Sequence, residues 1–106
     1  MYYIYMLRCE DNSIYTGITK DIKKRMEEHF SKDKNCAKYT LRHSAKKLEA
    51  VWQTKNRALA SKLEFRIKHL SKTEKEMLIK VNNLQELLGD KIEVEKYFRK
   101  DLTSFI

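Results

Sequence analysis

Two apolar runs separated by a polar cluster open the chain, and this pattern predicts a β-hairpin. The first run, residues 2–9, reads YYIYMLRC, and its continuous apolarity predicts a strand that is buried on both faces. Residues 10–13 read EDNS, which is turn chemistry, and residues 14–18 form the second apolar run. The chain therefore begins with two strands joined by a short turn.

The length of that turn decides where two tyrosines of the hairpin lie. A three-residue loop at positions 11–13 would pair Tyr15 with Cys9, and Tyr5 and Tyr15 would then share one face of the sheet. A four-residue loop would put them on opposite faces, because side chains alternate along a strand. In either case the two phenols also fit a plain aromatic core.

After the hairpin the apolar spacing lengthens to four, which predicts a helix. Ile22, Met26 and Phe30 recur at this spacing and mark a buried stripe, and Thr19 or Asp21 can cap the helix. Two segments follow this helix. Residues 31–46 are polar and basic and predict an exposed connection, and residues 48–53 (LEAVWQ) predict a third strand.

The second half of the chain is mainly helical. Apolar spacing predicts a helix over residues 56–70, and a capping-box pattern opens a third helix over 71–81. Residues 82–88 predict one more short helix, which Gly89 ends. Residues 92–106 are ambiguous between strand and helix.

The order β-β-α-β-α-α predicts an α+β fold with a small three-stranded antiparallel sheet flanked by helices. We expect residues 1–81 to form the functional domain and residues 82–106 to be a C-terminal extension. The extension offers an alternative role for the chain as an interaction protein. An apolar surface that could support a homo-oligomer would consist of Tyr97, Phe98, Leu102 and Phe105.

Charge is spread unevenly and favours a polyanionic partner. The chain carries a formal net charge of +8, with 19 Lys and Arg against 10 Asp and Glu in residues 1–81, and 4 against 5 in residues 82–106. Nucleic acid is the commonest partner of such a basic domain, although lysines also serve as ordinary solvated surface. The residues predicted to bind nucleic acid are Lys20, Lys23, Lys24, Lys38, Arg42 and Lys46, with Lys32, Lys34 and Lys47 beside them.

Cysteine usage and hydropathy favour a cytoplasmic location. Cys9 and Cys36 form no CxxC pair, and two cysteines alone cannot complete a zinc site. The start of the chain shows neither a basic leader nor a cleavage site, and no apolar run approaches the roughly 20 residues of a membrane span. We therefore expect a reduced setting and no membrane partner.

Four further positions are candidates for chemistry. Gly17 lies inside a strand, where glycine often marks a close approach of another group. Arg25 and His29, spaced i and i+4, lie on one helix face, where they could grip a phosphate or simply be solvated. Glu64 lies at the margin of an apolar stripe, where it could hold a metal ion or pair with Lys68.

Taken together, these residues resemble the GIY-YIG nuclease family. Residues 3–5 (YIY) and 15–17 (YTG) resemble its paired motif, residues 16–29 its first helix, and residues 63–75 the region of its metal-binding glutamate. The resemblance covers roughly residues 1–80 and is strongest to the small stand-alone bacterial members.

The sequence departs from the family pattern at four positions. Tyr3 replaces the first glycine of the paired motif, and Thr16 replaces its middle isoleucine. Ile18 stands where the repair-nuclease branch carries a lysine, so a lysine-assisted mechanism is not expected. Ser44 stands where the stand-alone branch often has proline.

The resemblance implies a metal-dependent endonuclease that hydrolyses phosphodiester bonds, with DNA favoured over RNA and branched, flapped or single-stranded forms as candidate substrates. It implies that Glu64 holds Mg²⁺ or Mn²⁺ and that Arg25 binds a phosphoryl oxygen. Tyr5 would be the base for the attacking water, with Tyr15 and His29 orienting the water or relaying its proton, or His29 would be the base itself. The alternative is a non-catalytic nucleic-acid-binding module of the same fold.

Overall fold

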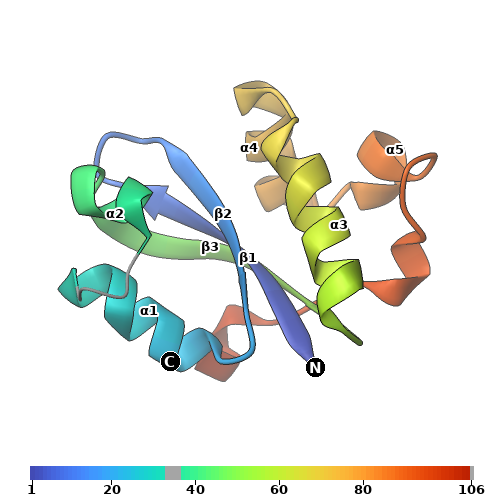
Figure 1. Cartoon of the computed structure of the whole chain (residues 1–106). Coiled ribbons are helices and arrows are strands. Elements are labelled where there is room, and N and C mark those ends of the chain that lie inside the picture. Colours follow the sequence, from blue (N-terminus) through green and yellow to red (C-terminus); the bar gives the residue numbers. More distant parts are fainter. Residues whose placement is uncertain (33–36, 106) are drawn as a thin grey trace.

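An antiparallel sheet forms the centre of the computed structural model, which describes residues 1–32 and 37–105 (Figure 1). The strands are β1 (Tyr2–Cys9), β2 (Ile14–Thr19), β3 (Ala45–Thr54) and β4 (Phe98–Arg99), in the order β2-β1-β3-β4. The predicted α+β class with an antiparallel sheet is confirmed. The predicted strand number is corrected from three to four over the described residues, because β4 pairs with Trp52 and Gln53 of β3.

Helices cover both faces of this sheet. They are α1 (Ile22–Ser31), α2 (Lys38–Arg42), α3 (Arg57–Lys68), α4 (Lys72–Val81) and α5 (Leu84–Leu88), with the 3₁₀ turns η1 (Val94–Lys96) and η2 (Leu102–Phe105). Figure 1 shows α1 and α2 on one side of the sheet and α3, α4 and α5 on the other. No helix in the described part of the chain is long and apolar enough to cross a membrane.

Side-chain caps set the starts of α1 and α4, as the sequence predicts. The Asp21 side chain accepts a hydrogen bond from the Lys24 backbone N–H at 3.1 Å at the start of α1. At α4 the Ser71 and Glu74 side chains each accept from the other's backbone N–H, which completes the predicted capping box. Such caps satisfy N–H groups that have no partner inside the helix.

The buried stripe of α1 differs from the prediction at its C-terminal end. Phe30 is 47% exposed, whereas the neighbouring His29 has no exposed surface. The reason is helix geometry, since seven residues make almost two turns at about 3.6 residues per turn. His29 therefore returns to the side of Ile22, while Phe30 is rotated away by about 80°.

The predicted exposed connection over residues 31–46 contains the short helix α2 and a fully buried side chain, Thr40. The local sequence gives no apolar signal for this burial, because Thr40 stands between Tyr39 and Leu41, of which Leu41 is 47% exposed. Residues 33–36 lie outside the described part of the chain, so the prediction for them stays a prediction.

The hairpin register differs from the three-residue-loop prediction but keeps its consequence. Tyr15 pairs with Leu7 instead of Cys9, because the loop spans the five residues 9–13. A shift of two positions along β1 preserves the alternation of side chains. Tyr5 and Tyr15 therefore share one face of the sheet, as a loop with an odd number of residues predicts.

Hydrogen bonds inside the loop explain its length. The Cys9 N–H donates to the Ser13 carbonyl at 2.9 Å, and the Asn12 N–H donates to the Cys9 carbonyl at 2.9 Å. Asn12 has a φ of 69°, a left-handed conformation that asparagine tolerates better than most residues. The Asp11 carboxylate also accepts from the Ser13 N–H at 3.1 Å, an Asx-type turn that tightens the loop.

The C-terminal extension packs back onto the sheet instead of presenting the predicted apolar surface. Tyr97 is buried and its hydroxyl donates to the Leu59 carbonyl at 2.7 Å. Leu102 and Phe105 pack against the cluster of buried residues on the α1 side of the sheet. Of the four residues in the predicted surface, Phe98 alone is strongly exposed, at 61%.

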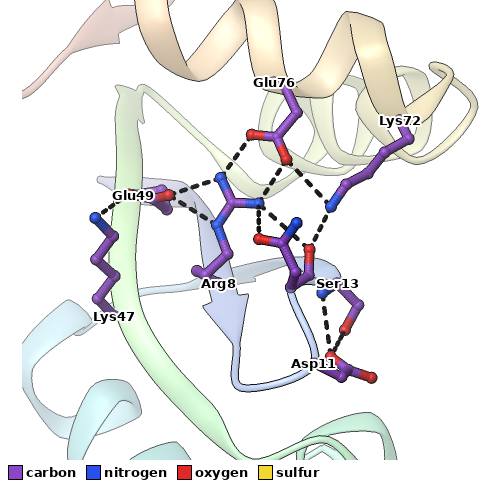
Figure 2. Close-up of polar contacts among 8 residues, drawn as sticks. Arg8, Asp11, Ser13, Lys47, Glu49, Lys72 and Glu76 are labelled. Carbon is purple, nitrogen blue, oxygen red and sulfur yellow. Dashed lines mark hydrogen bonds and ion pairs between the residues drawn. The ribbon is translucent and has the colours of Figure 1, made fainter.

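On the face of the sheet that α3 and α4 cover, one arginine ties together three parts of the chain (Figure 2). Arg8 of β1 donates to both carboxylate oxygens of Glu76 at 2.6 Å, which is a bidentate pair with α4. Its Nε also donates to Glu49 of β3 at 2.9 Å, and one terminal nitrogen donates to Asn12 Oδ1 at 3.2 Å. Lys72 contacts Glu76 and the Asn12 carbonyl from the other side.

Burial makes this network consequential for stability. The side chains of Arg8 and Glu49 are only 11% and 13% exposed, so their charges are largely removed from water. Hydrogen bonds from Arg8 lower the pKa of the Glu76 carboxyl to about 2. Removing one member of such a buried pair leaves the others uncompensated, which costs more than the pair itself contributes.

We expect Arg8→Met to lower the free energy of unfolding by about 3 kcal/mol, because Glu49 and Glu76 would lose their common cation. Lys96→Ala is the matched control, since the Lys96–Glu93 ion pair is 46% and 63% exposed. Exposed pairs contribute about 0–1 kcal/mol. Urea denaturation of the two variants measures both changes, and equal small losses would contradict the assigned role of Arg8.

Candidate active site

One face of the hairpin and one face of α1 bring four predicted side chains together. The ring centroids of Tyr5 and Tyr15 are 6.1 Å apart, and the His29 ring lies 5.6 Å from Tyr5 and 5.5 Å from Tyr15. Arg25, one helical turn before His29, donates from Nε to the Tyr5 hydroxyl at 3.4 Å. Two phenols, an imidazole and a guanidinium therefore form one cluster between β1, β2 and α1.

A hydrogen-bonded chain runs through the buried centre of this cluster. Tyr5 Oη lies 2.7 Å from His29 Nε2, and His29 Nδ1 lies 2.8 Å from the Thr40 hydroxyl. Thr40 donates to the Ala37 carbonyl at 3.1 Å, which uses its single proton. Thr40 must then accept from His29 Nδ1–H, so His29 Nε2 accepts from the Tyr5 hydroxyl.

The opposite proton arrangement fits less well. If Thr40 donated to His29, then His29 Nε2–H would donate to Tyr5, which already accepts from Arg25. The proton of Tyr5 would then have no acceptor among the described hydrogen bonds of that hydroxyl, and the Ala37 carbonyl would lose its bond. The hydrogen-bond series Tyr5→His29→Thr40→Ala37 uses each donor once. In it the imidazole is neutral, and its unprotonated Nε2 accepts from the phenol.

Burial and nearby charge keep the Tyr5 phenol and the His29 imidazole neutral. Burial raises the pKa of the Tyr5 phenol above its ordinary value, and the hydrogen bond from Arg25 offsets only part of that effect. Burial, and then the positive charge of Arg25, lower the pKa of His29 to about 4. At neutral pH His29 is therefore an unprotonated base, and Tyr5 is a phenol instead of a phenolate.

Gly17 makes room for the Tyr5 ring. The two residues pair directly across β1 and β2. A Cβ atom at Gly17 would lie 2.5 Å from Tyr5 Oη, 2.7 Å from Tyr5 Cζ and 3.0 Å from Tyr15 Cε2. Only a residue without a side chain lets the Tyr5 phenol lie flat over this strand, because Cβ contacts this short do not occur between unstrained atoms.

Glu64 approaches the cluster from α3, beside the β2 edge of the sheet. Its carboxylate pairs with the Lys68 ammonium at 3.4 Å, and that ammonium lies 5.7 Å from the centroid of the Tyr15 ring. The negative charge of Glu64 is also close enough to contribute to the raised pKa of Tyr5. Glu64 is thus linked to the Tyr15 side of the cluster through Lys68, and its own side chain is 23% exposed.

The donor set around Glu64 fits a cation held mainly by water and substrate. Magnesium commonly takes one or two protein carboxylates and completes its six ligands with water and phosphate oxygens. Among the described residues no group of three or more His, Cys, Asp or Glu side chains is gathered. Glu64 could therefore supply a single carboxylate ligand, whereas the described residues form no metal cage made of protein groups alone.

The predicted site residues differ in their access to solvent. Tyr5 and His29 have no exposed surface, whereas Tyr15, Arg25 and Glu64 are partly exposed. Tyr5 and His29 are therefore the fully buried members of the cluster, whereas the other three side chains reach solvent.

The predicted nucleic-acid-binding residues are all exposed where the structure describes them, namely Lys20, Lys23, Lys24, Lys32, Lys38, Arg42, Lys46 and Lys47. Lys34 lies outside the described residues. Lys20 lies over the Tyr2 ring, with its ammonium 5.4 Å from the centroid. Exposed cations can contact phosphates, but exposure alone does not distinguish that role from solvation.

Sequence reasoning missed two contributors to the cluster. Thr40, which fixes the His29 tautomer, has no motif of its own and comes from a segment that reads as polar connection. Glu28 pairs with Arg25 at 2.8 Å, an i,i+3 contact that helical spacing could have indicated. Lys68 appeared in the sequence only as a surface partner of Glu64, and that ion pair is present.

An antiparallel hairpin followed by a helix that carries Arg25 and His29, with Glu64 on α3, is the arrangement expected of the GIY-YIG family. The model of the GIY-YIG catalytic domain matches residues 1–77, and the chain belongs to this family of nucleases, whose substrates are nucleic acids.

Individual proteins are similar to this chain over most of their length. The UPF0213 protein FN1575 of Fusobacterium nucleatum is 51% identical over 78 residues, which are 74% of this chain and 76% of the relative. The UPF0213 protein BH0048 of Halalkalibacterium halodurans is 38% identical over 78 residues, 74% of this chain and 81% of the relative. A solution NMR structure of BH0048, described as from Bacillus halodurans, has a TM-score of 0.49 at 38% identity and covers 76% of this chain and 85% of that chain.

We expect the His29 imidazole to titrate near pH 4 with its proton on Nδ1 in the neutral form, because of its burial and its bond to Thr40. The ¹⁵N chemical shifts of the ring, followed from pH 8 to 4, measure both properties. A protonated Nε2, or a pKa near 6.5, would contradict the proposed hydrogen-bond chain.

The same shift makes stability depend on pH. The unfolded chain binds a proton on His29 near pH 6.5, whereas the folded chain binds it only near pH 4, so acid favours unfolding. Between pH 7 and 5 this residue should cost about 2 kcal/mol of the free energy of unfolding. Comparing the protein with His29→Gln by urea denaturation isolates the effect, since the variant should lose this slope.

We expect Gly17→Ala to lower the free energy of unfolding by about 1–3 kcal/mol, the usual cost of overpacking, because the added methyl group overlaps the Tyr5 ring. Thr19→Ser, near the end of β2, is the control for β2 itself, because it keeps the hydroxyl that accepts from the Asp21 N–H at 3.1 Å. Thermal denaturation measures both. A Gly17→Ala protein as stable as the original, with unchanged ring resonances for Tyr5, would show that the close approach is not a constraint.

Proposed function

We propose that the chain is a metal-dependent endonuclease that hydrolyses phosphodiester bonds of DNA. The observation that carries the proposal is the neutral hydrogen-bonded chain from Tyr5 through His29 to Thr40, with Arg25 at its outer end. A buried phenol bonded to a buried unprotonated imidazole is a device for moving a proton. Because the chain is basic and belongs to a nuclease family, we propose that this proton comes from the water that attacks the phosphate.

Tyr5 and His29 act as one base in this proposal. A water molecule gives its proton to Tyr5 Oη while the phenol proton passes to His29 Nε2, which lies 2.7 Å from the phenol oxygen. The resulting hydroxide attacks phosphorus, the bond to the leaving oxygen breaks, and that oxygen takes a proton from solvent. Both ring nitrogens of His29 are engaged, one by the Tyr5 hydroxyl and one by Thr40, so in this proposal Tyr5 is the contact with water and His29 stores the proton.

The substrate itself makes this transfer easier. In the free chain the pKa of His29 is low and that of Tyr5 is high, so the proton remains on the phenol. A phosphodiester anion beside the site favours the positively charged imidazolium. Positive charge near the phenol favours its phenolate form. Binding of the substrate therefore brings the pKa values of Tyr5 and His29 closer together, which makes the proton transfer easier.

Arg25 is proposed to bind a non-bridging phosphoryl oxygen. Its Nε is only 3.4 Å from Tyr5 Oη, a long hydrogen bond that a phosphate can replace with a charge-assisted one. Glu28 holds the same guanidinium at 2.8 Å and keeps it near the cluster. Moving Arg25 toward the phosphate would also open a path for water to the buried Tyr5 hydroxyl.

Glu64 is proposed to hold one Mg²⁺ or Mn²⁺ ion. When bound, such an ion supplies positive charge to the crowded phosphate and to the leaving oxygen. Lys68 now neutralises the Glu64 carboxylate at 3.4 Å and would have to release it. Lys68 is 47% exposed, so its ammonium can move into water at little cost.

DNA is the proposed substrate because the nucleophile is water and the reaction needs no 2′-hydroxyl. The exposed basic residues on α1, α2 and β3 would position the backbone without reading its sequence. Branched, flapped and single-stranded DNA are the forms to compare. A cytoplasmic location remains part of the proposal.

The test measures cleavage of labelled single-stranded, duplex and flapped DNA, and of matched single-stranded RNA, with Mg²⁺, Mn²⁺ or EDTA. We expect cleavage of DNA with either metal and none with EDTA. Tyr5→Phe and His29→Gln should each lower the rate by about 10²- to 10⁴-fold, the range for general base catalysis. Glu64→Gln should lower it by at least about 10²-fold, because charge stabilisation by the metal is lost.

Glu86→Gln is the matched control, because Glu86 is exposed on α5, on the other side of the sheet from α1. Its rate should equal that of the unmodified protein. Cleavage that is insensitive to both Glu64→Gln and EDTA would overturn the metal role. Binding of DNA without cleavage under any metal would favour a non-catalytic nucleic-acid-binding module instead.

A further inference from the structure

A series of rings leads from the buried tyrosine to the surface of α2. The Tyr15 ring lies 6.1 Å from Tyr5 and 5.5 Å from Tyr39, tilted by 30° to the latter. Tyr39 stacks on His43 with centroids 4.2 Å apart and planes within 22°. Three of these rings come from separate elements, β1, β2 and α2, and the His43 side chain at the outer end is 36% exposed.

A cavity of about 530 Å³ lies where this series reaches the surface. Its lining consists of Lys38, Tyr39, Leu41, Arg42 and His43. Two aromatic rings and one exposed leucine give it an apolar wall, while a lysine and an arginine, both exposed, border it with positive charge. The proposed catalytic mechanism uses none of these five side chains.

This combination of groups matches the chemistry of a nucleotide with an exposed base. Aromatic rings bind a nucleobase by stacking, which is tolerant of sequence, and neighbouring cations bind the phosphates on either side. A paired base offers no free face, because its neighbours in the duplex already stack on it. The cavity therefore fits an unpaired nucleotide better than a base pair.

Asp11 supports the outermost ring. Its carboxylate contacts His43 Nδ1 and thereby fixes the ring plane against Tyr39. Hydrogen bonds from Ser13 and His43 lower the pKa of Asp11 to about 2, so Asp11 is a carboxylate at neutral pH. A ring held on one face by Tyr39 and at one nitrogen by Asp11 is preorganised for stacking and loses little freedom when a base binds.

We propose that α2 carries a stacking subsite for one unpaired nucleobase of the DNA substrate, next to the phosphate that is cut. The subsite rests on the proposed function, since the ring series ends at the proposed base, Tyr5, and would set the distance between the unpaired base and the scissile phosphate. It assigns a substrate class to the nuclease, namely DNA with an unpaired nucleotide beside the cleaved bond.

The test measures binding in EDTA, so that no cleavage is needed. Fluorescence anisotropy follows a labelled single-stranded oligonucleotide and a set in which one nucleotide at a time is made abasic. We expect a loss of affinity of roughly 5- to 150-fold at the one position whose base stacks, which corresponds to the usual strength of base–aromatic stacking. Matched single-stranded RNA and duplex DNA form the comparison arms.

Two variants of one residue separate stacking from other effects. His43→Leu removes the ring and should show the same loss on the intact strand, with no further loss on the abasic one. His43→Phe keeps a ring without the contact to Asp11 and should stay within about threefold of the unmodified protein. Thermal denaturation verifies that both variants fold, and duplex affinity should not change in either.

Arg42→Gln provides a different control. Because it removes a phosphate contact, it should weaken intact and abasic strands equally and reduce the salt dependence of binding. An abasic scan without a sensitive position, or His43→Leu binding like the unmodified protein, would overturn the subsite. If cleavage persists in that case, the subsite alone fails, whereas base-dependent binding without any cleavage would refute the nuclease and support the subsite.

Discussion

The direct pairing of Tyr5 with Gly17 across β1 and β2 is the constraint on which the site depends. It places a phenol over a strand that has no side chain at that point, with almost no spare volume. The ring is then directed toward α1, where His29 accepts its proton. Had the hairpin paired with a shift of one residue, every side chain of β2 would change faces, and Tyr15 would leave the cluster.

The alternation of β1 separates the proposed base from the charged contacts of Arg8. Tyr5 and Leu7 belong to the cluster on the α1 side, whereas Ile4 and Met6 belong to the main core and Arg8 joins β3 and α4 on that same side. One strand thus carries the proposed base, Tyr5, on one face and the ion-paired Arg8 on the other. Substitutions on the two faces should therefore act on different properties of the protein.

Much of this arrangement follows from sequence patterns of local range. The ends of β1, the Asp21 cap, which was one of two candidates, and the capping box at Ser71 depend on neighbouring residues, so the sequence predicts them. The shared face of Tyr5 and Tyr15 stayed open in the sequence, because it depends on whether the loop has an odd or an even number of residues. The sequence could not supply the loop itself, since a five-residue turn and a three-residue turn are both compatible with EDNS.

Contacts between distant segments were beyond the reach of these patterns. The burial of Thr40 depends on a hydrogen bond across 11 residues to His29, and nothing in its own segment indicates it. The partners of Arg8 are 41 and 68 residues away, so the arginine reads as an interruption in an apolar strand. β4 has only two residues, too few to show the period of a strand.

In the proposed mechanism the burial of the free site gives these distant contacts a role. Tyr5 and His29 are buried and neutral, and two cations lie beside the cluster, Arg25 with a long bond to the phenol and Lys68 near the Tyr15 ring. A polyanion attracts both cations, whereas a neutral solute attracts neither. Exposure of the base would then require the substrate's own phosphate, so that water reaches the phenol chiefly when a phosphodiester is present to be attacked.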